Sequence, residues 1–183
     1  MYRDTVISLI IARCKSKGIS ISIKERALKG RTDLHKVDFA YPLEGDPVVT
    51  GEVKAIGSPE HVGFDERYIG MDIDKRVKEV KYTSIDLKRK FGPLVSKDWF
   101  TWISETQPKF YVFWIMRQGE KNSLNKVLEK IVSIREYANG VSAVIYASAG
   151  SHYRYVFLGS SQQRILSVDD LVNDICNIIS EIQ

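Results

Sequence analysis

Two acidic residues and a lysine fall in a pattern that suits the hydrolysis of a phosphodiester bond. Asp38 precedes a glycine-containing turn, and Glu52 and Lys54 follow it. Two carboxylates and one backbone carbonyl are oxygen ligands of the kind that Mg²⁺ prefers. A divalent cation lowers the pKa of water and neutralises charge that builds up on a phosphate, and a lysine beside it stabilises the transition state.

The segments around these residues have the alternating pattern of β-strands. Val37–Tyr41 and Val48–Ala55 both place apolar residues at every second position. Because side chains of a strand alternate between its two faces, Glu52 and Lys54 share one face. The apolar faces of both strands are expected to pack on the core. The opposite face is then expected to hold Asp38, Glu52 and Lys54 together.

The turn between the two strands sharpens this expectation. If the hairpin is centred on Gly45, the numbers of paired residues add up to 90, so Asp38 faces Glu52. Their Cβ atoms would then lie about 5 Å apart. A shift by one residue would break the hydrophobic pattern, which constrains the register. Two adjacent carboxylates repel each other unless a cation lies between them. Lys54 supplies part of that charge, and a divalent cation would supply more.

The remaining elements predict an α/β fold, a central mixed β-sheet flanked by helices, in one domain over residues 1–183. The expected order is helix, three strands, helix, strand, helix, two strands, helix. The boundaries are a helix from Tyr2 ended by Gly18, strands Ile19–Leu28, Val37–Tyr41 and Val48–Ala55, a loop Ile56–Met71, a helix capped by Asp72 and ended by Gly92, an irregular stretch with Trp99 and Trp102, a strand Phe110–Met116, a helix Ser123–Ala138, strands Val141–Ala147 and Tyr153–Leu158, and a last helix capped by Ser167.

Asp38, the hairpin and the sequence Gly51-Glu52-Val53-Lys54-Ala55 resemble the PD-(D/E)xK nuclease superfamily, which includes restriction endonucleases and archaeal Holliday junction resolvases. The order of elements up to about Ala147 is also similar to the common core of that family. The resemblance covers most of the chain in topology and about a dozen residues in motif.

The resemblance implies a restriction endonuclease-like core and a site in which Asp38 and Glu52 bind Mg²⁺, the Val53 carbonyl helps, and Lys54 is catalytic. Mn²⁺ is expected to substitute for Mg²⁺. The implied function is a magnesium-dependent DNA endonuclease of the restriction type. The alternatives are a structure-specific repair or recombination nuclease, a non-catalytic DNA-binding relative, and an unrelated α/β interaction domain that binds no DNA.

The chain departs from the family pattern in one place and offers rival acids. Asp38 follows Val37 where the family pattern has proline. Asp33 is a rival for the role of Asp38, although it lies before the strand. Asp4 or Glu25 is a candidate for an additional acid of the metal site.

Basic residues before the first acid and on the following helix are candidates for contacts with DNA phosphates. The candidates are Lys29, Arg31, Lys36, Lys75 and Lys78, and His35, Arg76, Lys81, Lys88, Arg89 and Lys90 lie among them. Acids among the helix residues make an ordinary solvated face an equal alternative. The glycine-rich loop up to Gly70 is a further DNA-facing candidate.

Charge is unevenly distributed along the chain, although its net value is only +4. Residues 1–36 contain nine Lys or Arg and three acids, whereas residues 167–183 contain four acids and no Lys or Arg. Such a distribution could guide a polyanion to one face. Because a domain of this size has one cleavage site, cutting of both DNA strands implies a homodimer.

The two cysteines, Cys14 and Cys176, are far apart and have no metal-like spacing. They are expected to be buried thiols, and an intracellular, cytoplasmic location is expected from them. No apolar run approaches the roughly 20 residues that a membrane span needs, so no membrane partner is expected.

Overall fold

A computed structural model describes residues 2–56, 69–92, 98–118, 124–149, 152–159 and 165–183. The helices and strands of the described residues follow the predicted order along the chain. One short helix and one 3₁₀ turn are present in addition. Their bounds are α1 Tyr2–Ser16, β1 Lys24–Lys29, β2 Leu34–Tyr41, β3 Val49–Ile56, α2 Ile69–Phe91, α3 Trp99–Glu105, β4 Lys109–Arg117, α4 Leu124–Val132, the 3₁₀ turn η1 Ser133–Glu136, β5 Gly140–Ala149, β6 His152–Phe157 and α5 Val168–Ser180.

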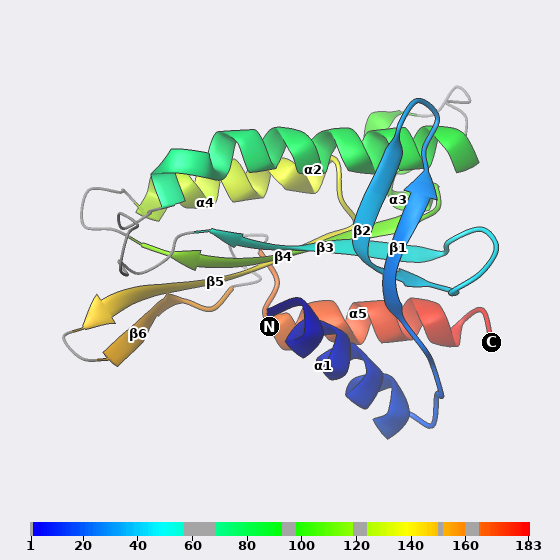
Figure 1. Ribbon diagram of the computed structural model, residues 1–183, viewed down its shortest axis with the longest axis horizontal. Coiled ribbons are helices and arrows are strands. Elements are labelled where there is room, and N and C mark those ends of the chain that lie inside the picture. The colour runs from blue at the N-terminus through cyan, green and yellow to red at the C-terminus, as the bar shows by residue number, and fades with distance from the viewer. Residues whose placement is uncertain (1, 57–68, 93–97, 119–123, 150–151, 160–164) are drawn as a thin grey trace.

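The described strands form one mixed sheet in which the spatial order β1-β2-β3-β4-β5-β6 repeats the order along the chain. Pairing is antiparallel from β1 to β3 and between β5 and β6, and parallel from β3 to β5. Helices α2 and α4 cover one face of the sheet, and α1 and α5 lie on the other (Figure 1). The prediction of an α/β fold with a mixed sheet between helices is therefore confirmed.

Apolar side chains fill the space on both sides of the sheet. Strand β4 shows this clearly, because its residues are almost all buried, as the continuous apolar run predicts. Phe110, Val112 and Trp114 join the core beneath α2 and α4, called here the α2/α4 core. Tyr111 and Phe113 join the core beneath α1 and α5, the α1/α5 core. The central strands are therefore covered on both faces.

Strand β1 and helix α2 begin at other residues than predicted. Strand β1 begins only at Lys24, although Ile19 and Ile23 before it are buried in the α1/α5 core. Their apolar character therefore reflects packing without strand pairing. Helix α2 begins at Ile69, so Asp72 lies in its first turn rather than at its cap. Residues 57–68 of the predicted loop lie outside the described residues.

The predicted irregular stretch around the two tryptophans contains a short helix. Asp98 caps α3 by accepting a hydrogen bond from the Thr101 N–H at 3.0 Å. Trp102 is 2% exposed and its indole N–H donates to the Gly92 carbonyl, while that of Trp99 donates to the Glu136 carbonyl. Both aromatic side chains are therefore anchored within the fold.

The expectation of two free thiols is wrong. Cys14 of α1 and Cys176 of α5 form a disulfide, with their Cα atoms 5.4 Å apart. Both residues are fully buried in the α1/α5 core. The inference of an intracellular location from unpaired thiols therefore loses its premise. Within the described ranges, no helix has both the length and the apolar character to cross a membrane.

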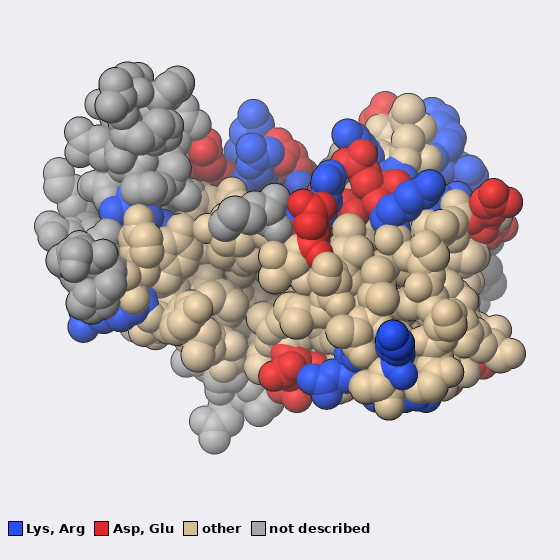
Figure 2. All heavy atoms as spheres, turned by 60° about the horizontal axis from the view of Figure 1, so that its bottom comes forward, with Lys and Arg blue, Asp and Glu red and all other residues tan. Residues whose placement is uncertain are grey.

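The basic and acidic ends of the chain lie side by side in the fold. Basic α1 and acidic α5 are joined by an ion pair of 2.9 Å between Arg13 and Asp169. Figure 2 looks towards the side of the molecule that these helices cover. Its middle is mostly uncharged, and many of the charged side chains gather towards its upper border. That the charge distribution guides a polyanion to one face stays a prediction.

Candidate functional site

The hairpin that carries the candidate acids has the predicted register. Phe39 pairs with Gly51, Ala40 with Thr50, and Tyr41 with Val49, and each pair of numbers adds up to 90. Gly45 at the turn has a φ of 71°, which glycine adopts without strain. The next position along this register would set Asp38 opposite Glu52.

Asp38 lies where β2 departs from regular pairing. On its other side, β2 pairs with β1 through Lys24–Ala40 and Arg26–Val37, so the register shifts between these pairs. Such a β-bulge redirects side chains and interrupts the ladder. The Val53 N–H donates to Asp38 Oδ2 at 2.8 Å, so the carboxylate contacts the backbone of β3.

The bulge also corrects one sequence expectation. Simple alternation would place Val37 and Phe39 on the same face. Val37 instead packs in the α2/α4 core and Phe39 in the α1/α5 core, because the extra residue reverses the alternation. A single-sequence pattern gives no sign of such an insertion.

Glu52 and Lys54 lie together on β3, as predicted. Lys54 Nζ is 2.6 Å from Glu52 Oε2, and the two side chains are 19% and 5% exposed. Val49 and Val53 of the same strand pack towards the α1/α5 core, and Ile56 packs in the α2/α4 core. Glu52 and Lys54 therefore face α2 and α4, a covered face rather than the non-core face that the sequence suggests.

Gly51 occupies a position of the motif that is closed to a side chain by direct contact. A Cβ atom there would lie 2.2 Å from the Phe39 ring and 2.6 Å from the Tyr111 carbonyl oxygen. Any larger residue would push β3 away from a neighbouring strand. The glycine therefore fixes the closeness of the strands that carry Asp38 and Glu52.

The oxygen atoms at this place fit a hard cation such as Mg²⁺. Glu52 Oε2 is buried, is close to Lys54, and makes no hydrogen bond of good geometry with any described residue. A buried carboxylate oxygen is costly unless positive charge compensates it. The Val53 carbonyl projects towards the same strand as its N–H, which is the side of Asp38. The described ranges contain no group of three or more His, Cys, Asp or Glu placed to hold a metal ion.

The rival acids are engaged elsewhere. Glu25 binds Arg3 at 2.7 Å and Lys36 at 3.0 Å, and Arg3 also contacts Asp4 at 3.3 Å. The hydrogen bond to Asp4 and its charge raise the pKa of Arg3, with smaller contributions from Glu25 and Asp38. Asp33 accepts a hydrogen bond from the Tyr82 hydroxyl in the turn between β1 and β2. Arg3 therefore neutralises the two acids proposed as additional metal ligands.

The five predicted DNA contacts are all exposed. Lys29 donates to the Thr32 carbonyl at 2.7 Å, and Lys36, 71% exposed, pairs with Glu25. The Arg31 side chain has no hydrogen bond or ion pair with another described residue. Lys75 and Lys78 lie on the outer surface of α2. Within the described part of the chain, none of the five makes a hydrogen bond or an ion pair with Asp38, Glu52 or Lys54.

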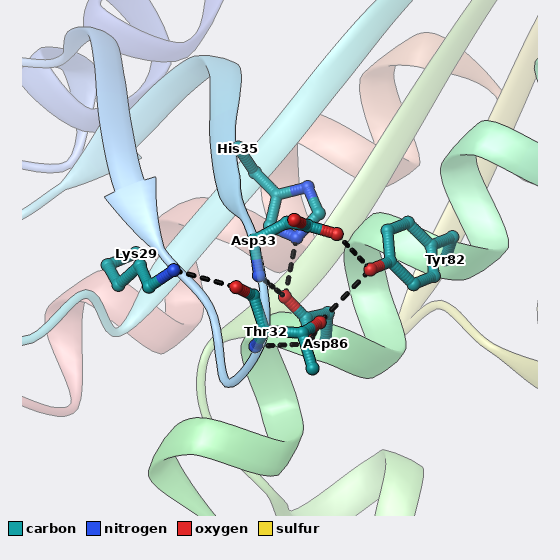
Figure 3. A network of polar contacts seen from close by, with 6 residues as sticks. All are labelled: Lys29, Thr32, Asp33, His35, Tyr82 and Asp86. Atoms are coloured by element: carbon teal, nitrogen blue, oxygen red, sulfur yellow. Dashed lines mark hydrogen bonds and ion pairs between the residues drawn. The ribbon is translucent and has the colours of Figure 1, made fainter.

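The turn between β1 and β2 is attached to α2 through a buried carboxylate (Figure 3). Asp86 of α2 is 4% exposed and accepts from Thr32 N–H at 3.0 Å, Thr32 Oγ1 at 2.6 Å and Asp33 N–H at 3.0 Å. His35 Nε2 lies 2.7 Å from its Oδ2. A Cβ atom on Gly30 would lie 2.1 Å from the same oxygen. In the sequence, Asp86 is one acid among many helix charges, and nothing marks its role.

These contacts predict how acid affects stability. Burial disfavours the ionised Asp86, but the hydrogen bonds from Thr32, Asp33 and His35 outweigh it and hold the pKa below the ordinary 3.8. A lowered folded-state pKa stabilises the protein above pH 3.8, and this contribution is lost as the pH falls below that value. We expect Asp86→Asn to destabilise the protein at pH 6, and the gap from the wild type to narrow towards pH 2.5. Urea unfolding of both proteins from pH 6 to pH 2.5 measures the difference in their free energies of unfolding. A difference that stays constant over this range would contradict the prediction.

Lys88, one of the helix lysines considered for phosphate contact, is fully buried instead. Its Nζ donates to the carbonyls of Thr106 and Pro108, both at 2.8 Å, and to Asn139 Oδ1 at 2.9 Å. Burial, with a contribution from the charge of Lys109, lowers the pKa of Lys88 to about 7. Its contacts are structural, and no DNA reaches it.

Comparison of the chain with protein-family models, curated proteins and solved structures finds no match in any of the three.

Proposed function

We propose that this chain is a magnesium-dependent DNA endonuclease of the restriction type that hydrolyses phosphodiester bonds. The observation that supports it most is the ion pair of 2.6 Å between Lys54 and the largely buried Glu52. It lies one step beyond the observed hairpin pairs, where a continued register would set Asp38 opposite Glu52. Surface ion pairs are common, but a lysine and a carboxylate that are both largely buried are costly to keep.

Each residue of the cluster has a distinct role in the proposed reaction. Asp38, Glu52 and the Val53 carbonyl would hold Mg²⁺, which when bound would supply positive charge and acidify the attacking water. Glu52 orients the Lys54 ammonium group through their ion pair. Lys54, 19% exposed, is reachable by substrate and stabilises negative charge as it develops on the phosphate.

The exposed basic residues favour a nucleic-acid substrate. Lys75 and Lys78 precede Asp86 on α2 by 11 and 8 residues, which corresponds to about 12–17 Å along the helix. Asp86 holds the turn that carries Arg31, so Arg31 and these two lysines are candidates to contact phosphates of the same nucleic acid. One cluster per chain cuts one strand, so cleavage of both strands calls for a homodimer.

Cleavage assays with purified protein test this proposal. Supercoiled plasmid, a four-way DNA junction and single-stranded RNA are incubated with Mg²⁺, with Mn²⁺ or with excess EDTA. We expect cleavage of DNA with either metal and none with EDTA. Discrete fragments from plasmid support restriction-type cutting, whereas cleavage confined to the junction supports a structure-specific nuclease.

Two results would overturn the enzymatic proposal. Cleavage that persists in EDTA would exclude the metal cluster as its source. No cleavage of any substrate, together with salt-dependent binding to DNA, would instead identify a non-catalytic DNA-binding protein.

A further inference from the structure

The β1–β2 turn is fixed to α2 by several hydrogen bonds to one residue, Asp86. Besides the four contacts to its carboxylate, the Asp86 carbonyl accepts a hydrogen bond from the Arg31 N–H at 3.1 Å. One residue of the helix thus contacts the backbone of Arg31, Thr32 and Asp33 in succession. The turn cannot change its conformation without breaking several hydrogen bonds to a buried charge.

Basic side chains surround the place where this turn is attached. Arg31 is exposed, and Arg89 and Lys90, one helical turn beyond Asp86, are exposed as well. The negative charge of Asp86 itself is buried and fully engaged by donors. The surface around the turn therefore carries more Lys and Arg than acids, with Asp33 as the exposed acid of the turn itself.

We propose that Asp86 is a positioning residue for DNA binding, which fixes the β1–β2 turn so that Arg31 contacts the phosphate backbone. This inference rests on the proposed function for its DNA partner. A turn held in one conformation before binding loses less conformational entropy when Arg31 contacts a phosphate. The coupling runs from the buried carboxylate through the turn backbone to an exposed guanidinium group.

Charge and positioning predict opposite effects of Asp86→Asn. The substitution removes one negative charge, so long-range electrostatics alone would strengthen DNA binding. The amide cannot accept all of the hydrogen bonds that the carboxylate accepts, so loss of positioning would weaken DNA binding. The direction of the change therefore separates the two explanations.

A double-mutant cycle tests the inference. Binding of a fluorescent DNA duplex is measured with Ca²⁺ for the full chain, Arg31→Ala, Asp86→Asn and the double variant. We expect each single substitution to weaken binding about five- to tenfold, and Asp86→Asn to have almost no further effect once Arg31 is absent. In both single variants, the negative slope of log K against log salt should also become smaller in magnitude by about 0.9, as expected for the loss of one phosphate contact.

Two further variants keep the test decisive. Thr32→Val removes one hydrogen bond to Asp86 without changing charge, so it should weaken binding less and in the same direction, even if Asp86→Asn fails to fold. Lys36 lies outside the turn. Lys36→Ala should therefore change the affinity for DNA by the same factor in the unmodified chain and in Asp86→Asn.

The outcomes separate this inference from the proposed function. Unchanged or tighter binding by folded Asp86→Asn, or full additivity with Arg31→Ala, would overturn the inference alone. If the unmodified chain binds no DNA, the inference and the proposed DNA substrate both fall.

Discussion

Replacement of Lys54 by methionine is expected to lower kcat for DNA cleavage by about a thousandfold. The reason is the loss of a positive charge at the point where charge develops on the phosphate, in a site of low exposure where it acts strongly. Methionine keeps the length of the side chain and leaves Glu52 without its ion-pair partner. Single-turnover cleavage with saturating Mg²⁺ measures the effect.

Controls separate chemistry from folding and binding. Lys126→Met replaces an exposed lysine on α4 and should leave the rate unchanged. Asp38→Asn should lower the rate and also weaken Mn²⁺ binding measured by calorimetry, because it removes a candidate metal ligand. Full activity of Lys54→Met would eliminate this cluster as the active site, whatever other residues cut DNA.

Replacement of Lys88 by methionine is expected to lower the free energy of unfolding by about 3 kcal/mol at pH 6. The protonated amine donates to two backbone carbonyls and one side-chain amide, and none of these acceptors is replaced by methionine. Buried acceptors that lose their donor cost about 1–3 kcal/mol each, offset in part because a buried charge is removed as well. Urea denaturation with an unchanged m-value measures the difference.

The neighbouring Lys90 provides the matched control. It is exposed on the same helix, so Lys90→Met should change the free energy of unfolding by less than about 0.5 kcal/mol. Equal stability of Lys88→Met and the unmodified chain would show that the three acceptors find other donors, and that this lysine does not hold α2 to the segments around Thr106 and Asn139.

The sequence-based predictions succeed where local patterns decide the structure. The continuous apolar run of β4 predicts its burial, and Gly45 predicts the hairpin register through turn geometry. Ser167 caps α5 as expected, since its hydroxyl accepts from the Asp170 N–H. The ion pair between Glu52 and Lys54 follows from their two-residue spacing on a strand.

The predictions fail where distant segments decide the structure. The bulge at Asp38, the disulfide between Cys14 and Cys176, and the burial of Lys88 all depend on partners far away in the chain. No period within one segment reveals such partners. Asp86 is the clearest case, because the four donors of hydrogen bonds to its carboxylate lie more than 50 residues before it.

The spatial order of the sheet has a consequence for how the chain assembles. Each strand pairs only with its neighbours in sequence, so a growing chain can add β1 to β6 one after another. Pairing is local in the hairpin of β2 and β3, but the parallel pair of β3 and β4 joins residues far apart in sequence, such as Val49 and Lys109. Such long-range pairing slows folding. The first and last helices are farther apart still in sequence, and Val6 and Ile10 pack in one core with Ile175 and Ile179. In a nascent chain, the buried apolar side chains of α1 therefore remain without this partner until α5 has been synthesised, and a chaperone that holds α1 during synthesis would act on that interval.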